Sequence, residues 1–301
     1  MSKTRNIDDH IGTCALCDTP AVTLRESHSI PKFVYQWIKD TSSTPYLRSS
    51  DNINSREQDG PKDYLLCDVC EGDLSKIETE LAEKLFKKIA NYRRQADEIR
   101  ITDKMRIAVL SIFWRALVTT LGRKSDRTEE DDIALRKFLS SAKEQIRNKL
   151  VTTRIYIAPF YGDPPFYELP VQITYLLDRM TGAQDTRFFD DPHRYFAVFK
   201  LPFMFFYIAI NWQEDELDPN AEFIGKIEMS EIRKIPDFLR TYILWLADQF
   251  RISGDKMTAQ NREIIARDTS KSKDLTGSHK SLTRSQEKKP QSPFSDDSIN
   301  G

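Results

Sequence analysis

The chain has 301 residues, of which 39% are hydrophobic and 30% charged, and its formal net charge is −1. A nearly neutral molecule is not a general polyanion binder, so any nucleic-acid surface must be a local patch. Residues Met1–Asn6 contain no apolar run, which predicts no signal peptide and favours a cytoplasmic protein. The most hydrophobic stretch, Tyr195–Trp212, is interrupted by Lys200 and Pro202 and is rich in β-forming residues, so it predicts buried strands and no membrane span.

The predicted elements divide the chain into four segments and indicate an α+β fold. Residues 1–10 are interpreted as a flexible polar tail, and residues 11–80 as a zinc-binding module. Residues 81–252 are interpreted as a helical middle followed by a small C-terminal β-sheet with a closing helix. Residues 253–301 are rich in Ser, Lys, Asp and Thr and predict disorder. In chain order, hydrophobic periodicity predicts helices at about 32–39, 73–99, 103–121, 129–150 and 235–250, and strands at 64–66, 153–160, 172–177, 195–200 and 203–210.

The four cysteines form two pairs, Cys14-Ala-Leu-Cys17 and Cys67-Asp-Val-Cys70. In a reducing compartment such pairs favour metal binding over disulfide formation. Four thiolates complete a tetrahedral Zn²⁺ shell without a histidine, so the 49 residues between the pairs must fold back on themselves. The alternative is two redox motifs, which is less favoured because neither pair opens a helix after a strand in a βαβ pattern.

The loop between the cysteine pairs contains Glu26-Ser-His-Ser-Ile-Pro-Lys32, with His28 eleven residues after Cys17. A neutral imidazole at this position could take a proton from water and act as a general base. The alternative is structural: His28 could hydrogen-bond to the loop backbone or replace one cysteine as a ligand. The residues alone leave both readings open.

Cleavage of a phosphodiester also needs a Lewis acid, usually Mg²⁺ or Mn²⁺ held by oxygen ligands. Asp59, Asp63 and Glu71 are the candidate carboxylates near the second cysteine pair. Downstream, residues 84–106 contain eight basic and three acidic residues, which could follow a phosphate backbone or form an ordinary solvated face. The candidate nucleic-acid-binding cations within the module are Lys32, Arg48, Arg56 and Lys62.

Four blocks follow one another within about residues 11–90: Cys14-x-x-Cys17, Glu26-Ser-His-Ser-Ile-Pro-Lys-Phe33, Asn54-Ser-Arg-Glu-Gln-Asp-Gly60 and Leu66-Cys-Asp-Val-Cys-Glu71. This order resembles a family of bacterial proteins that share a Ser-His-Ile-Ile-Pro-Lys-Phe block and a Gln-Asp-Gly block before the second cysteine pair. The pattern is in turn similar to the HNH endonuclease superfamily, whose zinc-supported members place an acidic-His-x-x-Pro segment between two CxxC knuckles.

The resemblance implies a treble-clef-like module with structural zinc on the cysteines, His28 as the general base and Asp63 near the middle asparagine of the motif. It implies a nucleic-acid substrate, DNA more than RNA, and by analogy a role in defence against foreign DNA. Two positions depart from the motif: Ser27 separates the acid from the histidine, and Glu71 stands near the closing histidine or asparagine. The alternatives are a non-catalytic zinc-stabilised scaffold, or a sensor whose C-terminal region binds a protein partner.

Overall fold

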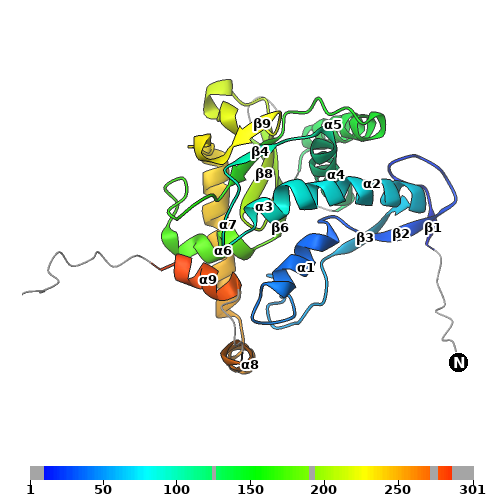
Figure 1. Ribbon diagram of the computed structural model, residues 1–301. Helices are drawn as coiled ribbons and strands as arrows, with labels where there is room; N and C mark the ends of the chain where they lie inside the picture. The colour runs from blue at the N-terminus through cyan, green and yellow to red at the C-terminus, as the bar shows by residue number, and fades with distance from the viewer. Residues whose placement is uncertain (1–9, 124–126, 190–193, 272–276, 287–301) are drawn as a thin grey trace, which may run out of the picture.

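The computed structural model describes residues 10–123, 127–189, 194–271 and 277–286. These residues form a mixture of helices and three small antiparallel sheets, which confirms the α+β expectation at this level (Figure 1). The expected 1–10 tail lies, apart from His10, outside the described residues. Within the described part of the chain, no helix combines the length and the apolar character that a bilayer crossing requires.

The N-terminal part is a three-stranded sheet in the order β1-β2-β3. β2 and β3 pair antiparallel with Ser27 opposite Asp63 and His28 opposite Lys62. α1 lies in the long connection between these two strands, and α2 begins directly after Cys67 (Figure 1). The elements of this part are β1 (Ile11–Gly12), β2 (Val22–His28), α1 (Lys32–Asp40), β3 (Lys62–Cys67) and α2 (Asp68–Leu81).

The helix that leaves the module is continuous across the expected boundary at residue 80. α2 passes into a π-helical turn, η1 (Ala82–Phe86), and then into α3 (Lys87–Ile89). The prediction of one helix over 73–99 therefore starts too late and ends too late. The helix stops because the side chain of Asn91 accepts hydrogen bonds from the backbone amides of Arg93 and Arg94, which favours a turn.

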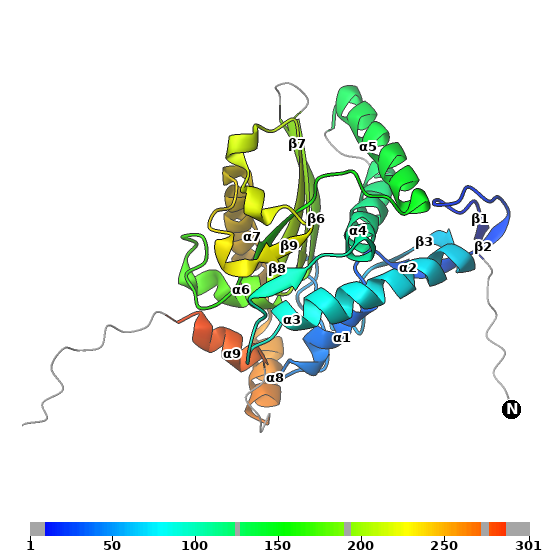
Figure 2. The same cartoon turned by 45° about the horizontal axis from the view of Figure 1, so that its top comes forward.

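α4 (Asp103–Leu121) is the central helix of the molecule, and its bounds agree with the prediction. Thr102 caps it by accepting a hydrogen bond from the amide of Met105. Eleven of its residues are buried, because the helix lies between α2 and the largest sheet (Figure 2). α5 (Glu129–Asn148) follows, with a capping box between Thr128 and Asp131.

The largest sheet has the strand order β5-β8-β7-β6. Phe196 on β7 stacks on Phe238 of α7, and Phe199 on the opposite face contacts Phe113 of α4. Helices on both faces explain why the Tyr195–Trp212 stretch is a nearly continuous apolar run. The strands of this sheet are β5 (Tyr156–Pro159), β6 (Gly182–Phe189), β7 (Arg194–Leu201) and β8 (Met204–Ile210).

Two sequence predictions in this region differ from the structure. The expected strand at 172–177 is instead the 3-10 turn η2 (Val171–Ile173) followed by the helix α6 (Thr174–Arg179), because Pro170 precedes a helical turn. The edge strand β6 was not predicted, because it is half-buried and its sequence is too polar to show an apolar pattern. A further two-stranded sheet pairs β4 (Glu98–Arg100) with β9 (Lys226–Glu228), and short turns occupy η3 (Glu214–Glu216), η4 (Pro219–Ala221) and η5 (Met229–Glu231).

The C-terminal region is helical as far as the structure describes it. α7 (Asp237–Asp255) matches the expected closing helix, and α8 (Ala259–Ser270) and α9 (Gly277–Arg284) follow it. The expectation of disorder over 253–301 is therefore wrong for these helices, while residues 272–276 and 287–301 lie outside the described residues. The sequence of α8 is polar because the helix has no buried residues. Hydrogen bonds, such as the one from Arg48 to Asn261, hold it in place instead of a buried apolar face.

Candidate metal centre

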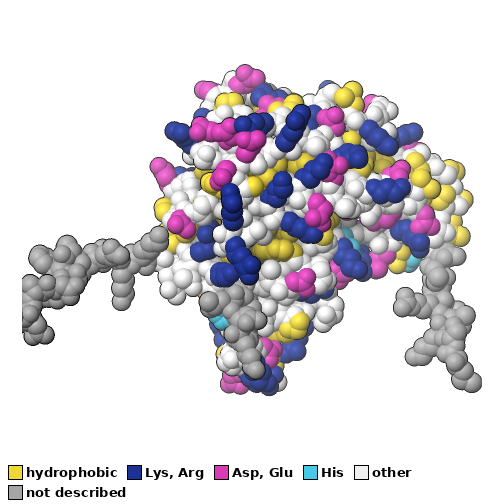
Figure 3. Space-filling model, viewed as in Figure 1, with side chains coloured by type: hydrophobic (Ala, Val, Ile, Leu, Met, Phe, Trp, Pro, Cys, Tyr) yellow, Lys and Arg dark blue, Asp and Glu magenta, His cyan; other side chains and the backbone are white. Residues whose placement is uncertain are grey.

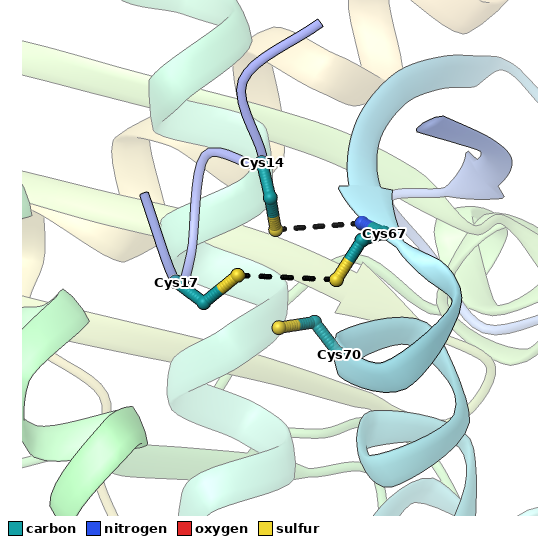
Figure 4. A group of neighbouring side chains, drawn as sticks. All are labelled: Cys14, Cys17, Cys67 and Cys70. Atoms are coloured by element: carbon teal, nitrogen blue, oxygen red, sulfur yellow. Dashed lines mark hydrogen bonds between the residues drawn. The ribbon is translucent and has the colours of Figure 1, made fainter. Parts of the chain in front are cut away.

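The four cysteines come together at one point (Figure 4). Their sulfur atoms all lie within 4.8 Å of one another, and Sγ of Cys17 is 3.9 Å from Sγ of Cys67. A tetrahedral zinc shell with Zn–S bonds of about 2.3 Å separates its sulfurs by about 3.8 Å. The cluster can therefore hold a metal ion such as zinc, as the spacing predicted.

Local backbone structure positions both cysteine pairs. The first pair lies in a tight turn in which the amide of Asp18 donates to the carbonyl of Cys14 over 2.9 Å, and Asp18 has a left-handed φ of 62°. The second pair lies at the junction of β3 and α2, with Cys67 at the N-cap of the helix. The amide of Cys67 points at Sγ of Cys14 over 3.4 Å, which ties the two pairs together.

The thiols of the cluster differ in their protonation. The pKa of Cys17 is lowered to about 6, mainly by hydrogen bonds with the side chain and backbone of Thr19. Burial raises the pKa of the Cys70 thiol. Zinc binds the thiolate form, so a bound ion would deprotonate these groups outright.

His28, at the end of β2, faces the turn that precedes β3. Its Nε2 atom is buried and lies 2.9 Å from Oδ1 of Asp59, and its side chain is 13% exposed. Oδ1 of Asp59 also accepts a 3.0 Å hydrogen bond from the amide of Gly60. Burial opposes the charge of Asp59, but this amide together with His28 and Lys62 keeps the pKa of the carboxyl below its ordinary value.

The Gln-Asp-Gly turn is shaped by an aromatic ring on α1. A Cβ on Gly60 would lie 1.9 Å from Cζ of Tyr35, so only glycine fits this position. The ring of Tyr35 also packs against His28, with the ring centroids 5.5 Å apart. The Tyr35 ring therefore lies against both the glycine of the Gln-Asp-Gly turn and the imidazole of His28.

Asp63 and Glu71, two of the four candidate catalytic residues, do not join His28. The hydroxyl of Ser27 donates to Glu71 over 2.7 Å, and the hydroxyl of Thr119 donates to Asp63 over 3.3 Å. Ser27 of β2 and Asp63 of β3 are directly opposite each other, so their side chains lie on one face of this strand pair. The neighbouring pair, His28 and Lys62, lies on the other face. The structure thus separates the four expected catalytic residues into two groups.

Arg115 on α4 is a site residue that sequence reasoning missed. It is 2% exposed, donates to the backbone carbonyl of His28 over 2.8 Å, and pairs with Glu78 of α2. An arginine inside a strongly apolar predicted helix was the available signal, because a buried charge must find a partner. Because Arg115 and His28 are 87 positions apart in the sequence, the pattern did not indicate this partner.

Three of the four candidate nucleic-acid-binding cations contact other side chains of the protein, although Arg56 and Lys62 are also exposed. Arg48 donates to Asn261 of α8 over 2.9 Å, and Arg56 stacks over the ring of Tyr46 at 4.6 Å. Lys62 lies 3.2 Å from Glu26 and 3.5 Å from Asp59. Lys32, at the start of α1, is exposed.

No family model, no curated protein and no solved structure matches the chain.

Proposed function

We propose that this chain is a non-catalytic, zinc-stabilised module that binds nucleic acid in a reducing compartment such as the cytoplasm. In this proposal the cysteine cluster holds Zn²⁺ and anchors a treble-clef-like hairpin and helix. The polar residues of the loop then brace its conformation, as the bond from Arg115 to the His28 carbonyl and the approach of Asp59 to His28 suggest. Zinc supplies folding free energy to small modules of this kind.

The observation that carries the proposal is the part-buried hydrogen bond from Ser27 to Glu71. Ser27 is 3% exposed, and its hydroxyl donates to the Glu71 carboxylate. This bond lies on the opposite face of the β2–β3 strand pair from His28. In the described residues, the four cysteines are the only group of three or more His, Cys, Asp or Glu side chains close enough to share one ion. Of the three expected carboxylates, the structure brings only Asp59 to His28, while Glu71 and Asp63 bond to Ser27 and Thr119. No step is therefore assigned to a catalytic Mg²⁺ or Mn²⁺.

The direct test is to incubate the purified protein with plasmid DNA and with RNA, in Mg²⁺ or Mn²⁺, beside His28→Gln. We expect no cleavage by either protein and nucleic-acid binding by both. His28→Gln should lower the melting temperature, because the contact with Asp59 is lost. Cleavage by the wild type that disappears in His28→Gln would overturn the proposal.

The second candidate is a metal-dependent endonuclease of HNH-like type, with a role in defence against foreign DNA. It is favoured by the 2.9 Å separation of His28 Nε2 and Asp59 Oδ1. A carboxylate beside one ring nitrogen orients an imidazole and leaves the other nitrogen as a proton acceptor. If this candidate is correct, Asp59→Asn should reduce cleavage at least tenfold while leaving the zinc content unchanged.

A further inference from the structure

Four exposed cations lie on neighbouring elements at the end of the long helix, and we call them the basic face. Lys88 is on α3, Arg93 and Arg94 are in the following turn, and Arg100 is on β4. Figure 3 shows Lys and Arg side chains distributed across the middle of this side of the molecule, over α3 and β4, with hydrophobic side chains between them.

The basic face is not neutralised by the protein. Within the described residues, no carboxylate oxygen lies within the 4.0 Å ion-pair distance of any of its four cations, as the ion pairs of the structure show. The acidic neighbours have other partners: Asp97 accepts from the hydroxyl of Tyr161, and Glu98 pairs with Lys226 over 2.7 Å. The other lysines of the same stretch are paired with carboxylates, namely Lys84 and Lys104 with Glu80, and Lys87 with Glu83.

Hydrogen bonds hold the backbone of the basic face in place. The amide of Ala96 donates to the carbonyl of Lys88 over 3.1 Å, which closes the turn onto the end of α3. The side chain of Asn91 fixes both arginines by accepting from their amides at 2.9 and 3.2 Å. Arg100 is held opposite Lys226 in the β4–β9 ladder. The backbone positions of the four residues are therefore fixed before any ligand binds, and only their side chains lose freedom on binding.

We propose that the basic face binds the phosphate backbone of nucleic acid. This deepens the proposed function by naming its binding surface, in place of Arg48, Arg56 and Lys62, each of which contacts other side chains of the protein. Four exposed charges spread over a helix end, a turn and a strand suit an extended polyanion, whereas a small anion requires donors that converge on one point. Lys32 begins the adjacent helix, whose Phe33 ring contacts Phe86 of η1.

The test measures binding of a fluorescent 30-mer, as duplex DNA, single-stranded DNA and RNA, between 50 and 200 mM salt. If each cation of the basic face neutralises one duplex phosphate, the logarithmic salt slope is about −3.6, so the affinity falls about 150-fold over this range. Arg93→Gln/Arg94→Gln should reduce the slope to about −1.8. The matched control is Arg136→Gln/Lys137→Gln, which removes two exposed charges on α5 and should leave the slope unchanged.

The outcomes separate this inference from the proposed function. Equal salt slopes for the two double variants would show that the basic face is not the binding surface, while leaving the proposal of nucleic-acid binding intact. Cleavage that depends on His28 would overturn the non-catalytic function while leaving the basic face intact. Binding to anionic lipid vesicles with no binding to any of the three nucleic acids would overturn both. Zinc content and far-UV circular dichroism check that each variant is folded, and Arg100→Gln gives an independent variant on β4.

Discussion

At the scale of single residues, the best-defined constraint is the contact between Gly60 and Tyr35. Gly60→Ala would place a methyl group against the phenol ring, and overpacking of this kind costs about 1–3 kcal/mol. Gly72→Ala is the matched control, because Gly72 lies inside α2 with nothing within 4 Å of the added carbon, and it should gain about 0.5–1 kcal/mol. Urea unfolding of both variants measures the difference, and a loss in Gly60→Ala no larger than in the control would contradict the contact.

Lys200 gives the second prediction at this scale, because it is fully buried in β7. Its ammonium group donates to the carbonyls of Leu177, Met180 and Leu201 at 2.6, 3.0 and 3.1 Å. Burial lowers the pKa of Lys200 to about 7, against the opposing charge of Asp178. Because the folded pKa lies below the ordinary 10.5, stability is greatest above pH 10.5, decreases as the pH falls from 10.5 to about 7, and changes no further below that.

Lys200→Met should therefore remove this pH dependence. The substitution leaves three carbonyls without their donor and should cost about 2–4 kcal/mol. As the pH is lowered from 10 to 7, the free energy of unfolding of the wild type minus that of Lys200→Met should decrease. Below pH 7 this difference should stay constant. Lys137→Met, at an exposed position on α5, controls for the loss of a surface charge. A difference that stays constant between pH 7 and 10 would refute the depressed pKa.

At the scale of elements, α8 acts as a brace for the long loop of the zinc module. Asn261 donates to the side chain of Asn54 over 3.1 Å and accepts from Arg48 over 2.9 Å. Asn261→Leu keeps the shape of the side chain but removes these bonds, so we expect amide hydrogen exchange to accelerate in residues 46–57. Gln260→Leu, at an exposed position of the same helix, is the control. Equal exchange in the two variants would show that α8 does not brace the loop.

The elements also show what could be predicted from sequence and what could not. α4 was predicted because its apolar pattern is a local signal, and the Thr102 cap found in the structure agrees with the predicted start. The cysteine cluster was predicted because ligand spacing is local within each pair. The separation of His28 from Glu71 was not predictable, because it follows from the register of β2 and β3, which the sequence does not display. α8 was missed for a related reason: its partners lie about 200 positions earlier in the chain.

At the scale of the whole molecule, the cysteine cluster and the main sheet share one core. The contiguous buried cluster includes Cys14 and Cys67 at one end and Phe196 and Phe206 at the other. α2 and α3 pass through it as one helix, so the zinc module has no separate core to unfold alone. Removing the metal should therefore destabilise the entire fold, although the cysteines occur only in residues 14–70.

We expect chelation of Zn²⁺, or Cys70→Ser, to lower the melting temperature while preserving a single unfolding transition. Zinc binding to unoccupied thiolates supplies folding free energy, and in a shared core this energy stabilises all elements together. Differential scanning calorimetry with and without a chelator measures both features, and added Zn²⁺ should restore the wild type but not Cys70→Ser. Two separate transitions after chelation would show that the module and the sheet fold independently. An unchanged profile in a protein that contains no zinc would show that the cysteine cluster does not use a metal.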